Sequence, residues 1–142
     1  MLKAIFSRER ALHLSLLWLR VVPSLVMITA HGWPKLMRVE RLWERFPDPL
    51  GIGSSASLVC ALGAEVGCAA LIIVGLYTRF AAIPLAFTMG VAAFMVHGDD
   101  PWSKKELAVI YMVVFLALAL TGAGRYSLDD WRAKRRLRKV QK

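Results

Sequence analysis

Four apolar segments, each close to the length of a membrane-spanning helix, dominate this chain. They cover about residues 11–33, 55–76, 79–98 and 104–122. A helix of about 20 residues crosses the hydrocarbon core of a bilayer, which is about 30 Å thick. The segments lack the alternating pattern of membrane β-strands, and only helices and closed barrels satisfy backbone groups in lipid. The sequence therefore predicts an all-α membrane protein, residues 1–142, whose single domain is a four-helix transmembrane bundle.

Composition supports lipid as the surroundings of these segments. Hydrophobic residues make up 57% of the 142 residues, above the roughly 45–50% of soluble domains. The net charge of +9 lies between and beyond the apolar segments. No nucleic-acid-binding motif accompanies it, so nucleic acid is not an expected partner. A cleaved signal peptide is the alternative for the first segment, but that segment is too long and contains Arg20, so we expect it to be retained.

The distribution of basic residues predicts the orientation. Loops on the cytoplasmic side of membrane proteins carry an excess of lysine and arginine. Twelve of these residues fall on the side that holds both termini, and six fall on the other side. We therefore expect both termini in the cytoplasm.

Two charged segments flank the apolar ones. In residues 34–46, apolar side chains recur at helical spacing among arginines and glutamates, which predicts a short amphipathic helix in the outer membrane interface. Residues 127–142 form a basic cytoplasmic tail, in which Ser127 can cap a helix. Anionic lipid is the expected partner of this tail, and docking of a partner protein is the alternative.

Two ionisable residues lie near the middle of membrane segments, Arg20 in the first and Glu65 in the second. An ionised side chain is costly in hydrocarbon, so such residues normally face a protein interior and a partner. Antiparallel packing would bring the two residues to nearly the same depth, which predicts a buried ion pair. The pair either fixes the register of the helices or provides catalytic groups that handle protons.

A second set of polar residues lies toward the outer side. His31 and His97 end the first and third segments, with Lys35 and Glu106 close by in the sequence. We interpret them as a ligand site for a quinone headgroup. A metal ion or a partner is the alternative ligand; the sequence assigns no metal site, and a bis-histidine haem is not expected.

Structural roles are the alternative for the same residues. Each histidine precedes a glycine and would then complete the C-terminal end of a helix. Ser103 and Glu106 have the spacing of a capping box at the start of the fourth segment. Tyr111, inside that segment, would need a hydrogen-bond partner if buried, and it is a further candidate for ligand binding.

The second segment also carries a small-xxx-small motif, Gly63 and Gly67, which lets helix backbones approach closely. Glu65 projects from the opposite face of the same helix. We therefore expect both faces to have protein neighbours, either within the bundle or in a homo-oligomer formed through the two glycines.

Taken together, these residues resemble the DoxX family of small bacterial integral membrane proteins. The resemblance rests on Arg20 with Pro23, His31-Gly32-Trp33-Pro34-Lys35, Glu65 with Gly67, residues 75–79, His97, Glu106 with Tyr111, and residues 122–129. It covers about residues 15–130, and Ala123, where we expect proline, is a small departure. The resemblance implies a multi-pass protein of the bacterial inner (plasma) membrane. It also implies kinship with DoxD, the membrane subunit of a thiosulfate:quinone oxidoreductase, and with proteins of thiol and oxidative-stress complexes.

The leading functional interpretation is a redox-associated membrane subunit that handles a quinone or its protons within a larger oxidoreductase system. The chain has no cofactor motif and no closely spaced cysteine pair, so electrons would come from a soluble redox enzyme partner or a reducing substrate. A non-catalytic scaffold that recruits soluble enzymes through the basic tail is the second interpretation. A small-molecule transporter acting as an oligomer is the third. The sequence leaves open whether the chain is itself an enzyme.

Overall fold

The computed structural model describes the backbone of residues 8–140 and the side chains of residues 8–139. Lys3, one of the basic residues used for the orientation, and the last two residues of the basic tail lie outside this range. Within it every regular element is a helix, which confirms the all-α prediction.

In chain order these are α2 (Arg8–Val26), a π-helical segment (Met27–Gly32), α3 (Trp33–Leu36), α4 (Val39–Leu42), α5 (Ser54–Leu62), a second π-helical segment (Gly63–Cys68), α6 (Ala69–Val74), α7 (Thr78–Val91), a third π-helical segment (Ala92–Val96), α8 (Trp102–Thr121) and α9 (Leu128–Val140).

Three long helices are each built from α-helical and π-helical parts. They run continuously over Arg8–Leu36, Ser54–Val74 and Thr78–Val96, and each is long and apolar enough to cross a membrane. Helix α8 has 20 residues, but Lys104, Lys105 and Glu106 lie in its first turns and shorten its apolar part. The structure therefore supports three candidate membrane spans, and the fourth remains a prediction.

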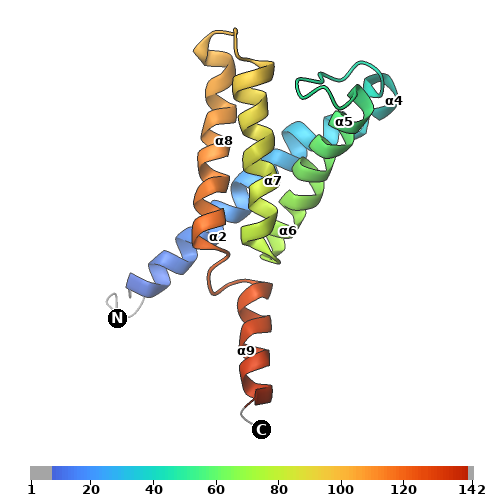
Figure 1. Cartoon of the computed structure of the whole chain (residues 1–142). Coiled ribbons are helices and arrows are strands. Elements are labelled where there is room, and N and C mark those ends of the chain that lie inside the picture. The colour runs from blue at the N-terminus through green and yellow to red at the C-terminus, as the bar shows by residue number, and fades with distance from the viewer. Residues whose placement is uncertain (1–7, 141–142) are drawn as a thin grey trace.

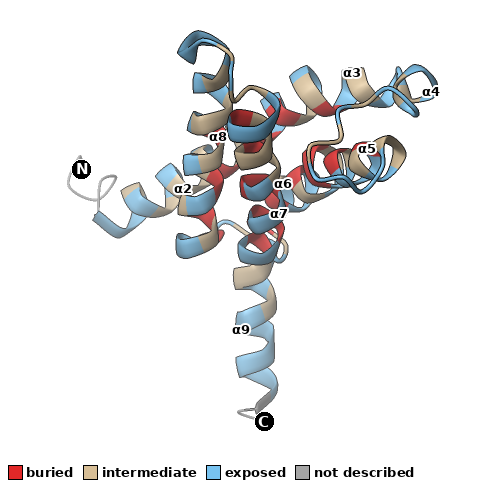
Figure 2. Cartoon of the chain, turned by 45° about the horizontal axis from the view of Figure 1, so that its top comes forward, coloured by how far each residue is buried: buried red, intermediate tan, exposed pale blue. Residues whose placement is uncertain are grey.

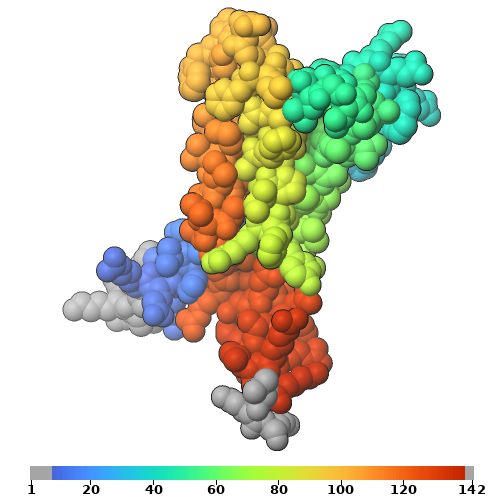
Figure 3. Space-filling view, viewed as in Figure 1, coloured from blue at the N-terminus to red at the C-terminus, as the bar shows by residue number. Residues whose placement is uncertain are grey.

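The long helices pack in two crossing pairs (Figure 1). Helix α7 lies antiparallel to α8, and α2 packs against α6. The loop between α4 and α5 and the connection from α7 to α8 lie at one end of the molecule (Figure 1). The turn from α6 to α7 and the start of α9 lie at the opposite end, and α9 extends away from the other helices (Figure 3).

The segment after the first long helix differs from the expected single helix over residues 34–46. Pro34 lies inside the first long helix, which continues to Leu36. The chain then leaves the helical conformation at Arg38 (φ −114°, ψ 19°) before the single turn of α4. The expected helix is therefore divided into two short pieces by the break at Arg38.

The buried residues lie at the centre of the molecule, where the long helices meet (Figure 2). Ala81, Ala82 and Leu85 of α7 are buried with Phe115 and Leu118 of α8. Large apolar side chains cover much of the exterior, with Phe80 74% and Leu120 79% exposed. An apolar exterior of this kind suits a lipid environment better than water.

Candidate functional site

Arg20 does not meet Glu65, so the expected ion pair between them is wrong. Nη1 of the buried guanidinium donates to the carbonyl oxygens of Ile72 (3.0 Å) and Ile73 (2.8 Å) near the end of α6. Nη2 donates to the carbonyl oxygen of Tyr126, just before α9. The last carbonyls of a helix lack their usual partners within it. Arg20 donates to two of them here, although the carbonyl oxygen of Ile72 also accepts from the amide of Gly75 (3.0 Å). The arginine therefore joins three segments at the end of the molecule where α9 begins.

Gly75 makes room for this arginine. The residue ends α6 with a left-handed backbone (φ 70°), which favours glycine. A Cβ atom there would lie 2.3 Å from Nη1 of Arg20 and 2.5 Å from the Cβ of Ser127. This close packing gives a structural reason for one of the motifs that resemble the DoxX family.

The partner of Glu65 is Lys35. The sequence predicts Lys35 in a ligand site toward the outer side, together with His31, His97 and Glu106. Nζ of Lys35 donates to both carboxylate oxygens of Glu65, at 2.6 Å for Oε2. The side chain of Glu65 is only 3% exposed, and that of Lys35 is 27% exposed. A buried carboxylate needs such a partner, because an unpaired buried charge is strongly destabilising.

Lys35 and Glu65 lie in or beside the first two π-helical segments. Glu65 lies within the segment Gly63–Cys68, and Lys35 follows the segment Met27–Gly32. The helices approach closely at Gly32, where a Cβ would lie 2.6 Å from Cγ2 of Val66 and 3.3 Å from the carbonyl group of Glu65. π-helical turns are rare and frequently occur at functional sites.

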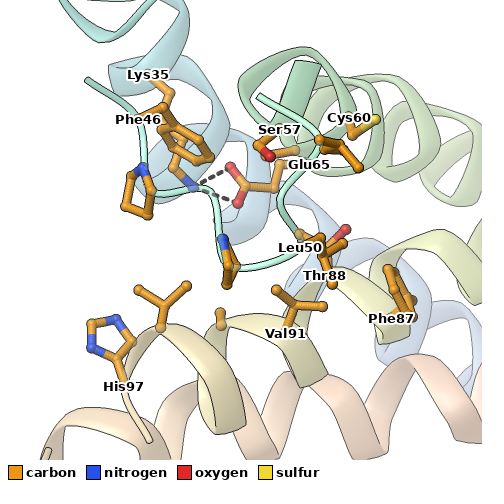
Figure 4. A pocket seen from close by; sticks show the side chains of 16 residues that line it. Lys35, Phe46, Leu50, Ser57, Cys60, Glu65, Phe87, Thr88, Val91 and His97 are labelled. Atoms are coloured by element: carbon orange, nitrogen blue, oxygen red, sulfur yellow. Dashed lines mark hydrogen bonds and ion pairs between the residues drawn. The ribbon is translucent and has the colours of Figure 1, made fainter. Parts of the chain in front are cut away.

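The ion pair lies in a pocket of about 360 Å³ between the second and third long helices (Figure 4). Apart from Lys35 and Glu65, few polar side chains line it; Thr88 and His97 are among them. Most of the wall is apolar and includes Phe46, Pro49, Leu50, Ile52, Phe87 and Val91. Such a volume suits a small organic ligand. In the described part of the chain, no group of three or more His, Cys, Asp and Glu side chains is placed to hold a metal ion.

Asp48 shapes this pocket, and sequence reasoning missed it. Oδ1 accepts hydrogen bonds from the amide of Ile52 (3.0 Å) and from Oγ of Ser57 (2.8 Å), and Oδ2 accepts one from the amide of Gly53 (2.7 Å). These bonds fold residues 46–53 into one wall of the pocket. The bond from Ser57 and those from the loop amides lower the pKa of the Asp48 carboxyl. The signal in the sequence was an aspartate between two prolines, ahead of a glycine-rich turn.

The two histidines predicted for the same outer ligand site lie in different surroundings. His97 lines the pocket, and its Nδ1 lies 2.8 Å from Oδ2 of Asp100. This contact, together with the one from Lys104, lowers the pKa of Asp100. His31 instead packs edge-on against Tyr111, with ring centroids 5.8 Å apart. His31 lies within a continuous helix, so it does not complete a helix end.

Glu106 belongs neither to the pocket nor to the contact between His31 and Tyr111. It lies exposed on α8 and is not among the residues that line the pocket. The predicted capping box is also wrong, because α8 begins at Trp102 with Pro101 at the cap position and Ser103 lies inside the helix. Tyr111 is buried and stacks against Phe115 at 6.1 Å.

Asp129 has an unexpected structural role near Arg20. Its carboxylate accepts hydrogen bonds from the amides of Tyr77 (2.8 Å), at the N-cap position of α7, and of Thr78 (3.0 Å), the first residue of α7. Its own amide donates to the carbonyl oxygen of Gly75 (2.9 Å). A carboxylate at this position satisfies free N–H groups at the helix start and interacts favourably with the helix dipole. The start of α9 is thereby fixed to the turn between α6 and α7.

Gly63 and Gly67 are exposed in the single chain. Apart from the adjacent residues and the backbone of the same helix turns, no atom of the described chain lies within 4 Å of the position that a Cβ would take at either glycine. The close approach expected at this motif is therefore not made within the described residues.

Comparisons with known proteins agree with the resemblance seen in the sequence. The DoxX family model matches residues 15–98, which is more than half of the chain. An uncharacterized protein of Haemophilus influenzae (strain Rd) is 35% identical over 91 residues, which cover 61% of this chain but only 60% of that protein. A second uncharacterized protein of the same organism is 31% identical over 126 residues, or 81% of this chain and 88% of the relative. No solved structure matches the chain. The family match over more than half of the chain shows that this chain belongs to the DoxX family.

Proposed function

We propose that this DoxX-family membrane protein binds a quinone in the pocket formed by Lys35, Glu65 and His97, as a redox-associated subunit of a larger oxidoreductase system. The observation that carries the proposal is a buried ion pair within an otherwise apolar cavity of ligand size. A quinone ring is apolar and carries two carbonyl oxygens. The apolar wall suits the ring, and the ammonium group of Lys35 suits a carbonyl oxygen as a hydrogen-bond donor.

The same pair can supply protons. Reduction of a quinone to a quinol takes two electrons and two protons, one proton at each oxygen. Lys35 holds protons beside the pocket, and Glu65 accepts and returns them as the charge of the site changes. Intramembrane carboxylates often have such roles. The electrons come from a soluble partner or a reducing substrate, in keeping with the kinship to DoxD that the family resemblance implies.

The proposal is tested by measuring the quinone bound to gently extracted protein by mass spectrometry and absorption spectroscopy. The wild type should retain quinone, and Glu65→Gln should lose most of it while remaining folded. Glu9→Gln is the matched control, because the side chain of Glu9 is 80% exposed and Glu9 is not among the residues that line the pocket. A wild type that retains no quinone, or a Glu65→Gln variant that retains as much as the wild type, contradicts the proposal.

The placement in the membrane belongs to the same proposal. Helix α8 is the fourth span, the membrane is the bacterial inner membrane, and both termini are cytoplasmic. The pocket then opens near the outer side. Labelling of single-cysteine variants with a reagent that does not cross membranes tests this topology, in a chain whose Cys60 and Cys68 are replaced by serine. Asp99→Cys should react in spheroplasts, and Arg136→Cys should not.

A non-catalytic scaffold is the second candidate, and the position of α9 favours it. The helix extends away from the long helices (Figure 3) and carries exposed arginines and lysines, including Arg135, Arg136 and Arg138. Its base is held by Arg20 and Asp129. The exposed basic surface suits either anionic lipid or the acidic surface of a soluble enzyme. Deletion of the residues after Asp130 keeps both anchors; on this second proposal it abolishes recovery of soluble partners while the long helices stay folded.

A further inference from the structure

The pocket that holds the ion pair shares a wall with a second cavity. A groove of about 460 Å³ runs along the third long helix and α8. Ile83 and Gly90 on α7, Met95 on the π-helical segment that follows it, and Met112 and Leu116 on α8 are among its lining residues. Phe87 and Val91 line both this groove and the pocket. The two cavities therefore share side chains of the same helix.

The groove is apolar and faces outward. Every side chain that lines it is hydrocarbon, aromatic or thioether, apart from Gly90, which has none. Phe87 is 60% exposed and Leu116 is 47% exposed. A groove of this chemistry at the surface of a membrane protein accepts an aliphatic chain.

The pocket has room for a ring but not for a ring with a long tail. Its volume is about 360 Å³, near the lower limit of about 300 Å³ for small-molecule sites. The polar groups that would orient a ring are Lys35 and Glu65, and Phe87 lies away from them (Figure 4). A tail on such a ring therefore leaves the pocket past Phe87, toward the groove.

We propose that the ligand of the pocket is a long-tailed amphiphile that enters from the bilayer, and that its tail lies in the groove between α7 and α8. The inference rests on the proposed quinone function and deepens it, because it assigns a prenylated or alkylated quinone instead of a water-soluble one. The groove extends from Ile83 to Met95, a rise of about 18 Å along the helix. That length accommodates several isoprene units.

Gly90 gives the groove its depth. A Cβ at this position would lie 3.4 Å from Sδ of Met112. A larger side chain at position 90 therefore fills the space between α7 and α8 without entering the pocket of Lys35 and Glu65. This separation makes Gly90 a suitable position for a test.

The tail gains little free energy from leaving lipid, because lipid is as apolar as the groove. The affinity of the ligand is therefore a poor measure of binding in the groove. The experiment instead determines directly where the tail lies. The probe is a ubiquinone analogue whose ten-carbon tail carries a photoreactive diazirine. It is added to the full chain in lipid nanodiscs, with or without excess unlabelled decyl-ubiquinone, and the labelled peptides are identified by mass spectrometry.

The expected result is labelling of residues 83–95 and 112–116 that falls at least fivefold when the competitor is present. Gly90→Leu should reduce this competed labelling at least fivefold, whereas Ala70→Leu, at an exposed position on α6, should leave it unchanged. Leu116→Trp and Leu120→Trp form a second matched pair, one inside and one outside the groove, in case Gly90→Leu does not fold.

The other outcomes separate this inference from the proposed function. Competed labelling on another face, such as a site formed by a second copy, overturns the groove and leaves the quinone pocket intact. Labelling of the groove that the competitor does not reduce shows ordinary lipid contact and also overturns the groove. No competed labelling anywhere, with tailless ubiquinone also failing to bind, overturns the quinone function itself.

Discussion

Gly32 lies directly against the backbone of Glu65. A Cβ on Gly32 would come within 3.3 Å of the carbonyl carbon and oxygen of Glu65. The two π-helical segments meet at this contact, and it sets the register between the first and second long helices. Lys35, one turn later, is thereby placed opposite the carboxylate of Glu65.

Substitution of Gly32 should therefore disturb the site from a distance. We expect Gly32→Ala to lower the free energy of unfolding by about 1–3 kcal/mol, because an added methyl group forces a well-packed contact apart. Thermal unfolding in detergent measures the change. Gly63→Ala is the control, since no described atom from another part of the chain lies within 4 Å of its Cβ position. Equal stability of Gly32→Ala and the wild type would show that the close contact is not made.

Removal of Lys35 alone should lower the free energy of unfolding more than removal of both Lys35 and Glu65. Lys35→Met leaves the buried carboxylate of Glu65 without its partner, which typically costs about 3–5 kcal/mol. Lys35→Met combined with Glu65→Met replaces the pair by apolar groups and should recover much of that loss. The comparison is made by thermal unfolding of each variant. Lys134→Met, which breaks the more exposed pair with Asp130, should change stability by only about 0–1 kcal/mol.

The loop that walls the pocket should loosen in acid. Hydrogen bonds from Ser57 and the loop amides lower the pKa of Asp48 in the folded protein. A carboxyl with a lowered folded pKa stabilises the fold above its unfolded pKa, about 3.9 for aspartate, and this contribution is lost as the pH falls through the folded value. Amide hydrogen exchange at Ile52 and Gly53, corrected for intrinsic rates, should therefore accelerate below about pH 4.

Asp48→Asn is the matched variant for this effect. It should show faster exchange at Ile52 and Gly53 already at neutral pH, with no further acceleration specific to acid. Asp99→Asn, in the connection from α7 to α8, should keep the acid response of the wild type. An acid response that persists in Asp48→Asn would assign the effect to another group.

Asp129 should stabilise the start of α7. Asp129→Ala removes the acceptor for the amides of Tyr77 and Thr78, and loss of such a cap typically costs about 0.5–2 kcal/mol. Limited proteolysis should also cut the connection before α9 more readily. Asp130→Ala is the control, because the Asp130 carboxylate pairs with Lys134 on α9 itself and not with α7. If both variants resist proteolysis equally, α9 is not held through Asp129.

The lengths of the apolar segments were enough to predict the helices, because only a helix can bury its own backbone groups in lipid. The ends of the helices were less predictable. The His31-Gly32 pair has the pattern of a helix end, yet Gly32 is needed for close packing inside a helix. Propensity alone does not distinguish these two uses of glycine.

The partners of the buried charges could not be predicted from depth alone. Arg20 and Glu65 are near the centres of their segments, but Gly32 packs against Glu65 and Arg20 binds carbonyls near the end of α6, so the two charges lie at different levels of the second long helix. The sequence identified Lys35 and His97 as site residues for their position near one end, and both line the pocket. Asp48 escaped notice because its importance depends on three hydrogen bonds made by a folded loop.

The most direct test of the account is a comparison of two charge exchanges, measured by thermal unfolding. Lys35→Glu and Glu65→Lys should each destabilise the protein strongly, and the double exchange should restore most of the lost stability. Arg20→Glu combined with Glu65→Arg should restore none, because Arg20 binds the carbonyl oxygens of Ile72 and Ile73 instead of Glu65. Recovery in the Arg20 exchange, with none in the Lys35 exchange, would contradict the central claim that Lys35 is the partner of Glu65.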